Sequence, residues 1–259
     1  MPRMSGAKMA QNSGGESDEH ATPLGFYGWD MKVPPIEAMF GSEIYTRDYF
    51  HFFRVSDSAK ILVLTNDNGT KDAPSTADLL RVLVKFYYKN VDADLVVKAF
   101  VRYVNYPNRF EDFNVSFKGA SFVDGEEPNS PLGELGKLVN SKKVPKTIFL
   151  VFDALFWSLG GWSAKRVNME EPLSSKKFFD MIRATLLQVG KETLQHSAAQ
   201  TKILKEFGYD AVFDNSTKGV IWSMEPRQIV VLNKSMIENT KMFTADYDSL
   251  KELVYEFGK

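Results

Sequence analysis

The segment from Phe207 to Phe243 constrains the fold more than any other part of this 259-residue chain. Gly208 ends a predicted helix, and Pro226, which cannot donate a ladder hydrogen bond, marks the start of a strand or a bulge. Glu225 is therefore expected where two strands meet, a place from which a carboxylate can point out of a sheet. The pattern predicts three strands, separated by a polar turn and by the proline: Asp210–Phe213, Gly219–Trp222 and Arg227–Leu232.

Apolar spacing and capping residues predict the other elements. The run at Lys146–Phe152 is apolar on both faces, which is typical of a central strand. Tyr45, Tyr49 and Phe52 follow helical spacing. Further strands are expected at Lys60–Thr65 and Phe113–Lys118, and a turn or short helix at Ser235–Thr240. Helices are expected at Ser42–His51, Ala77–Lys89 (capped by Ser75 or Thr76), Ala93–Val104 (capped by Asp92), Leu132–Val139, from a Ser174 or Ser175 cap to Gly190, Glu192–Phe207 and Asp248–Phe257.

The order of these elements predicts the fold class and the domain organisation. Helices and hairpin-linked strands are mixed without regular βαβ alternation, which favours α+β over a doubly wound sheet. Residues 1–22 have almost nothing to bury and are expected to form a disordered tail. Residues 23–259 are expected to form a single domain with a helical insertion near residues 75–140, with two domains as the alternative.

Composition excludes several classes of protein. With 44% hydrophobic and 25% charged residues, the chain is of an ordinary globular type, and its net charge of −1 predicts no general nucleic-acid binding. The absence of cysteine excludes disulfides, cysteine nucleophiles and thiolate metal sites. The three histidines are far apart in sequence, so no histidine-rich metal site is expected. His51 is expected to be packed among aromatic residues, and His196 is expected to lie on an exposed helix face. No run of 18 apolar residues occurs, which predicts a cytoplasmic protein without a membrane span.

The segment 203–243 resembles one family. A helix is followed by Gly208-Tyr-Asp-Ala, a short hairpin, and Glu225-Pro-Arg-Gln228 before an apolar strand that ends in Asn233-Lys-Ser. This order resembles the C-terminal end of ADP-ribosyltransferase-like domains, above all those in polyvalent and virion proteins of phages and other mobile elements. The resemblance implies a split β core with flanking helices. It also implies a phage-encoded protein that acts in the cytoplasm of a host cell or travels in a virion.

The same resemblance implies a chemistry and the residues that perform it. NAD would be the substrate, no metal would be needed, and ADP-ribose would pass to a protein or nucleic-acid acceptor. Glu225 resembles the catalytic glutamate, which stabilises positive charge on the ribose as the bond to nicotinamide breaks. Tyr45 or Tyr49 resembles the tyrosine that stacks on nicotinamide. Tyr27, Gly28 and Gln228 complete the expected NAD contacts.

The chain departs from the family pattern in the first strand. The family carries Tyr-His-Gly or Tyr-Arg-Gly there, whereas this chain has Phe26-Tyr-Gly-Trp29, so Tyr27 supplies a hydrogen-bond donor without a positive charge. This departure favours an alternative function, a catalytically inactive structural or host-binding protein on the same fold that exposes an apolar patch or forms an oligomer. Trp157 and Trp162 are candidates for such a patch or for the core.

Each candidate residue also has a purely structural interpretation. Glu225 has the sequence context of a solvated loop carboxylate, and Gln228 that of a surface residue on a strand. The two tyrosines at helical spacing would equally serve packing, and Gly28 a turn or a close backbone approach. The pair Tyr209-Asp210 is expected to fix the connection from helix to strand, with Asp210 accepting hydrogen bonds from backbone donors.

Overall fold

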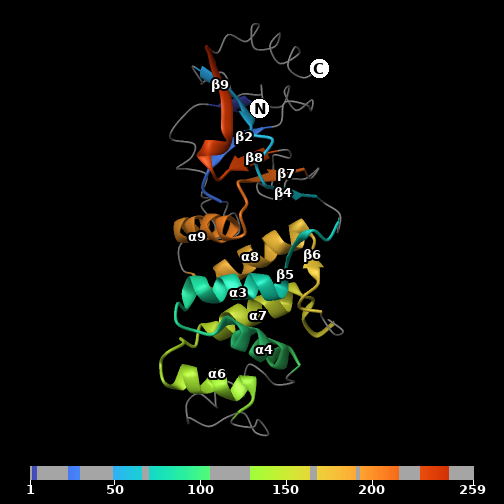
Figure 1. Ribbon diagram of the computed structural model, residues 1–259, viewed down its shortest axis with the longest axis vertical. Coiled ribbons are helices and arrows are strands. Elements are labelled where there is room, and N and C mark those ends of the chain that lie inside the picture. The colour runs from blue at the N-terminus through green and yellow to red at the C-terminus, as the bar shows by residue number, and fades with distance from the viewer. Residues whose placement is uncertain are drawn as a thin grey trace. The chain divides into compact units, whose positions relative to one another are not determined.

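A computed structural model describes eight segments of the chain: residues 2–4, 23–29, 49–65, 70–105, 129–163, 168–190, 193–215 and 228–244. These residues form an α+β structure with six α-helices and small sheets, and the described strands form no closed barrel (Figure 1). The chain divides into two compact units. One combines Met1–Gly69 with Glu192–Lys259, and the other is Thr70–Lys191.

The first unit is built around a four-stranded mixed sheet. Its order is β2-β8-β7-β4, with β4 and β7 parallel and the other two pairs antiparallel. Gly25 enters this sheet so close to β8 that a Cβ atom would lie 2.5 Å from the carbonyl oxygen of Val231, which only glycine permits. The strands are β2 (Phe26–Trp29), β4 (Ile61–Leu64), β7 (Ala211–Asp214) and β8 (Gln228–Val231).

A second sheet shares an apolar core with the first. Its order is β1-β3-β9, from β1 (Pro2–Met4), β3 (Tyr49–Val55) and β9 (Ile237–Thr244). Phe53 of β3 packs with Ala211, Ile229 and Val231 of the four-stranded sheet, and Val55 and Ile237 pack against the same cluster. Two separate sheets thus contribute one core in this unit.

Helix α9 (Thr193–Glu206) leads into β7 through a short junction that joins several strands. Asp210 accepts a hydrogen bond from the backbone N–H of Lys60 at 3.0 Å and another from Nδ2 of Asn233 at 2.9 Å. Lys60 Nζ donates to the carbonyl oxygen of Phe207 and lies over the ring of Tyr209. The residues before β4, before β7 and after β8 therefore meet at Asp210. The prediction that Asp210 accepts a hydrogen bond from a backbone donor is confirmed by its contact with Lys60.

We expect Asp210→Ala to lower the free energy of unfolding by about 2 kcal/mol, because two donors lose their acceptor at a junction between strands. Urea denaturation measures this loss. Asp57→Ala is the control, since Asp57 is exposed and pairs only with Arg54 at the surface, where such pairs contribute under about 1 kcal/mol. Equal losses in the two variants would contradict a special role for Asp210.

The second unit is helical. Its apolar centre contains Phe100, Tyr103, Phe149 and Phe152, whose rings pack against one another. Its elements are β5 (Ala73–Ser75), α3 (Thr76–Tyr87), α4 (Ala93–Val104), α6 (Pro131–Asn140), α7 (Ile148–Ser158), β6 (Pro172–Leu173) and α8 (Ser175–Val189), with a 3₁₀ turn at Gly161–Ser163.

Capping residues set the starts of four of these helices. Ser75 and Asp78 form a capping box at α3, in which each side chain bonds the other residue's backbone N–H. Asp92, Ser130 and Ser174 accept hydrogen bonds from the first turns of α4, α6 and α8. The predicted caps of α3, α4 and α8 are confirmed.

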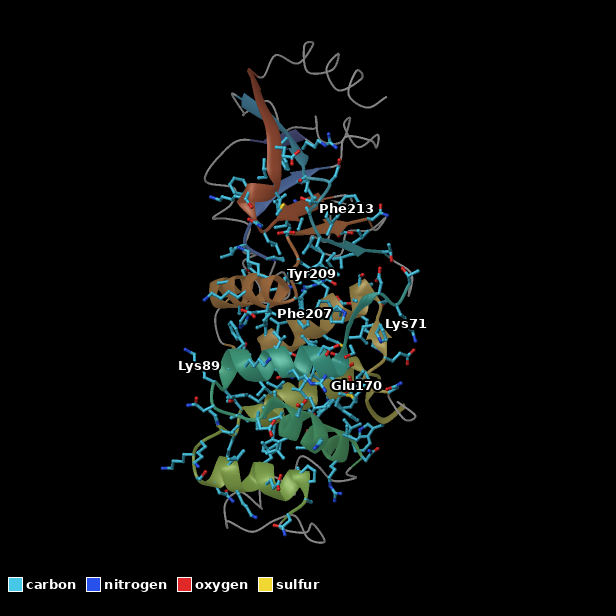
Figure 2. The ribbon with its side chains drawn as sticks, viewed as in Figure 1. Lys71, Lys89, Glu170, Phe207, Tyr209 and Phe213 are labelled. Carbon is cyan, nitrogen blue, oxygen red and sulfur yellow. The ribbon has the colours of Figure 1, made fainter. Side chains whose placement is uncertain are left out.

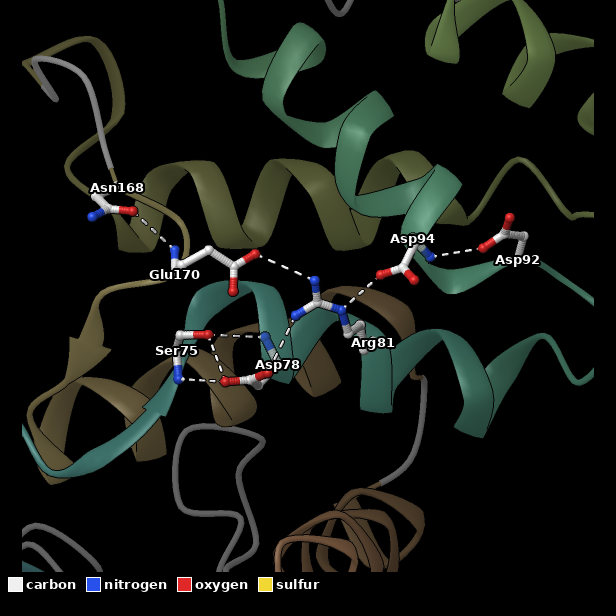
Figure 3. A network of polar contacts seen from close by, with 7 residues as sticks. All are labelled: Ser75, Asp78, Arg81, Asp92, Asp94, Asn168 and Glu170. Carbon is white, nitrogen blue, oxygen red and sulfur yellow. Dashed lines mark hydrogen bonds and ion pairs between the residues drawn. The ribbon is translucent and has the colours of Figure 1, made fainter.

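An ion-pair network ties α3 to α4 and to the segment before β6 (Figure 3). Arg81 bonds Asp94 at 2.9 Å, Asp78 at 3.2 Å and Glu170 at 3.3 Å. The hydrogen bonds to Asp94 and Glu170 raise the pKa of Arg81. The hydrogen bond from Arg81, and then its charge, hold the pKa of the Asp94 carboxyl below its ordinary value of 3.8.

This network predicts a stability change in acid. Because the pKa of Asp94 is lower in the folded than in the unfolded chain, its contribution is complete above pH 3.8 and is lost as the pH falls through the folded value. We expect the free energy of unfolding to fall more steeply below about pH 4 in the wild type than in Asp94→Asn. Urea denaturation at a series of pH values measures both curves. Parallel curves would contradict the contribution of Asp94.

The structure corrects three predicted elements. Lys146–Phe152 is not a strand, because the apolar run continues into α7, a helix that is buried over most of its circumference. Tyr49–His51 is not helical, since β3 begins at Tyr49 and pairs with β9 along its length. The turn expected at Ser235–Thr240 is a single 3₁₀ turn, Lys234–Met236, followed by β9. The strands predicted at Phe113–Lys118 and Gly219–Trp222 and the helix at Asp248–Phe257 lie outside the described residues.

The helical unit is longer than the predicted insertion near residues 75–140, because α7 and α8 belong to it as well. Of the predicted tail, residues 5–22 lie outside the described residues, and Pro2–Met4 pairs with β3. No helix in the described segments is both long and apolar enough to cross a membrane.

Candidate functional site

Three of the described candidate residues, Tyr27, Gly28 and Gln228, lie in adjacent strands of the four-stranded sheet. Strands β2, β4 and β7 run in the same direction, because β4 is parallel to β7 and both β2 and β7 are antiparallel to β8. Their carboxyl ends therefore lie at a single edge, and β8 begins there with Gln228. Side chains at such an edge come from different parts of the chain, an arrangement that many ligand sites use.

Gln228 is the residue at this edge that most needs an explanation. Its neighbours Ile229 and Val231 belong to the core between the two sheets, so Gln228 points to the opposite face of its sheet. The side chain is 5% exposed, and its Oε1 atom has no hydrogen-bond partner among the residues that the structure describes. A buried acceptor without a donor costs about 1–3 kcal/mol, so a donor from a bound group would be stabilising at this position.

Asp214 lies next to Gln228 across the sheet. The antiparallel register pairs Val212 with Val230 and Phe213 with Ile229, which brings Asp214, the last residue of β7, opposite Gln228. Directly opposed residues place their side chains on one face with Cβ atoms about 5 Å apart. Asp214 is fully buried. A carboxylate and an amide thus share one buried position at the edge where three strands end.

The structure brings some of the predicted site residues together and leaves others apart. Tyr27 and Gly28 lie in β2 and pair with Val230 and Ile229, so they adjoin the strand that carries Gln228. Gly28 is buried and shares the core face with Ile229. Tyr49 is in β3, in the other sheet, and pairs with Thr244. Tyr45 and Glu225 lie outside the described residues.

Sequence reasoning missed Asp214. The signal was a carboxylate at the end of an apolar strand, before a turn, and that position is usually exposed. The sequence-based prediction that His196 lies on an exposed helix face is also wrong. His196 is buried in α9 together with Ser197 and Gln200. Neither the Ser197 hydroxyl nor the Gln200 amide has a hydrogen-bond partner among the described residues. The weak amphipathic pattern of this helix gave no sign of which face is covered.

The chemistry of this edge is that of a hydrogen-bonding site. The Asp214 carboxylate accepts hydrogen bonds from hydroxyl and amide groups, and a glutamine amide both accepts and donates them. A sugar hydroxyl or a carboxamide is therefore the kind of ligand group that forms hydrogen bonds with side chains of these two types. Among the described residues, no group of three or more His, Asp or Glu side chains could hold a metal ion.

Comparison with known proteins adds no relative. No family model matches the chain, and no curated protein and no solved structure is significantly similar to it. The candidate site therefore stands on its own geometry and on the resemblance of residues 203–243.

Proposed function

We propose that this protein has an ADP-ribosyltransferase-like fold and transfers ADP-ribose from NAD to a protein or nucleic-acid acceptor. The observation that carries the proposal is the buried Gln228, whose Oε1 atom has no donor among the described residues, beside the buried Asp214. Glu225 stands three residues before Gln228 in the sequence, and β8 begins at Gln228. On the family pattern, the protein is phage-encoded and acts in the cytoplasm of the host or from within a virion.

The arrangement of the sheets supports the proposed fold. Two separate sheets, β1-β3-β9 and β2-β8-β7-β4, meet at one apolar core, which is the form expected of a split β core. The helix α9 and the strands β7 and β8 follow the order that the resemblance to the family implies. Tyr27 and Gly28 lie in β2, which pairs with β8, the strand that carries Gln228.

The proposed reaction breaks one bond and forms another at the same carbon atom. The bond between C1′ of the ribose and the nicotinamide nitrogen breaks, and its electron pair leaves with neutral nicotinamide. A nucleophilic oxygen or nitrogen of the acceptor then bonds to C1′ and loses its proton to solvent. Glu225 would stabilise the positive charge that develops on the ribose. Gln228 would hold a polar group of the nucleotide through Oε1, and Asp214 would hold a neighbouring hydroxyl.

A second function is a binding role on the same fold without catalysis. Two observations favour it. Tyr27 supplies no positive charge for the phosphates, and two indole rings are exposed in the helical unit. Trp157 and Trp162 are 55% and 66% exposed, and both pack edge-on against Phe156. The Trp157 ring also lies against Gly161, where a Cβ atom would be 2.6 Å from the ring. These rings are held in place, as in a surface that binds a partner.

Incubation of the purified protein with labelled NAD and a cell lysate separates the two functions. Transfer predicts label on discrete macromolecules, and nuclease and protease treatment then identifies the acceptor class. A folded protein that leaves every band unlabelled contradicts the transferase proposal. In that case Trp157→Ala and Trp162→Ala test the binding role, through loss of a captured partner or of self-association.

A further inference from the structure

One end of the helical unit carries a concentration of lysines that the net charge of the whole chain conceals. Between Glu134 and Asp153 the chain has no carboxylate and four lysines: Lys137, Lys142, Lys143 and Lys146. All four are exposed. Three of them belong to the connection between α6 and α7, which we call the lysine loop (residues 141–147).

Lys142 occupies a backbone conformation that disfavours it. Its φ of 61° makes it the one non-glycine residue with positive φ among the described residues. The N–H of Lys143 bonds the carbonyl oxygen of Leu138, and the N–H of Lys142 bonds that of Val139, which together form a Schellman motif at the end of α6. Glycine is the residue that this position favours. A lysine that persists in a strained conformation indicates a use for its side chain.

The lysine loop is joined to the C-terminal end of α3. The Tyr88 hydroxyl lies 3.2 Å from Oγ1 of Thr147, and Lys89 and Lys146 are the residues next to this contact in the chain. Figure 2 shows Lys89 at that end of α3. Within the described residues, Lys89, Lys142 and Lys143 make no ion pair.

Among the described residues, the carboxylate nearest in sequence to Lys89 already has a structural role. Asp92 is the nearest carboxylate along the chain to Lys89, and its Oδ1 atom already accepts hydrogen bonds from the first backbone N–H groups of α4. The exposed indoles are not part of this surface, because Trp157 lies at the C-terminal end of α7 and the loop precedes its N-terminus. An 11-residue helix separates them by about 16 Å.

We propose that the lysine loop and Lys89 form a docking surface for the phosphate backbone of a nucleic acid. Lysine ammonium groups contact phosphates as point charges, which bind without reading sequence. The loop exposes no large apolar side chain for insertion into a membrane, since Val144 is buried. The surface is in the helical unit and does not depend on the proposed NAD site. It revises the expectation, drawn from net charge alone, that no general nucleic-acid binding occurs.

Fluorescence anisotropy with labelled single-stranded and duplex oligonucleotides tests the proposal on the full chain. We expect the wild type to bind, and we expect the logarithm of its association constant to fall linearly with the logarithm of the salt concentration. The double variant Lys142→Glu, Lys143→Glu should bind at least about tenfold more weakly than the wild type. The slope of its plot of log affinity against log salt concentration (the salt slope) should be smaller in magnitude by about 2. The control is Lys202→Glu, Lys205→Glu on α9, which makes the same charge change at exposed positions of the other unit.

A single variant separates binding from stability. Lys142→Gly relieves the positive φ, so we expect a higher melting temperature together with weaker nucleic-acid binding and a salt slope lowered by about 1. Three results would overturn the proposal: no salt-dependent binding by the wild type, an equal loss of affinity in the control pair, or unchanged affinity in Lys142→Gly. Binding to phosphatidylserine vesicles without binding to either oligonucleotide would assign the surface to a membrane instead.

Discussion

Glu225→Gln is expected to reduce the transfer of ADP-ribose from NAD by at least about 10²-fold while the protein stays folded. The substitution keeps the size of the side chain and removes the negative charge that would stabilise the oxocarbenium-like ribose. Binding of NAD should change much less than the rate, because the charge on the ribose develops only in the transition state. Label transfer measured at saturating NAD gives the rate, and circular dichroism checks the fold.

The closest control for this variant is Glu206→Gln. Glu206 is an exposed glutamate in the last turn of α9, so the same change there should leave transfer intact. Transfer by Glu225→Gln at the wild-type rate would remove Glu225 from the mechanism. Equal losses in both variants would point to a general effect of charge rather than to a catalytic carboxylate.

Gln228→Leu is expected to have two opposite effects. It should weaken NAD binding by at least about tenfold, because the ligand loses a buried hydrogen-bonding partner. It should also raise the free energy of unfolding of the unliganded protein by about 1 kcal/mol, since leucine has a similar size and removes an acceptor that has no donor among the described residues. Calorimetry measures the affinity, and urea denaturation measures the stability.

Gln188→Leu makes the same chemical change at an exposed position of α8 and should alter neither quantity appreciably. A loss of stability in Gln228→Leu without a change in affinity would make Gln228 a structural residue. An unchanged protein in both measurements would show that water satisfies its Oε1 atom in solution.

The sequence predicted most helices of the structure because their local signals are strong. Ser75 and Asp92 stand directly before periodic apolar residues, and the structure starts α3 and α4 at those caps. The sequence also predicted β4, β7 and β8, since short apolar runs between turn residues favour strands.

The errors arose where tertiary contacts decide between helix and strand. The run that begins at Ile148 is apolar on all sides, and periodicity does not distinguish a buried strand from a buried helix. The aromatic segment at Tyr49 matches helical spacing as well as strand propensity, and pairing with β9 settles it as a strand.

The candidate site was predicted in part. Gln228 was identified through its place in a motif, although its burial could not be read from the sequence. Asp214 was missed, because only the register between β7 and β8 brings it opposite Gln228. The lysine loop was missed for a similar reason. Its charge is visible in the sequence, but the positive φ of Lys142 and the contact of Tyr88 with Thr147 are not.

Titration of the wild-type protein with NAD in a calorimeter tests the central claim most directly, since every proposed role at the sheet edge requires that NAD bind there. We predict saturable heat from one site per chain, a signal that persists in Glu225→Gln and weakens in Gln228→Leu. A folded wild-type protein that gives no heat with NAD at millimolar concentration would contradict the account.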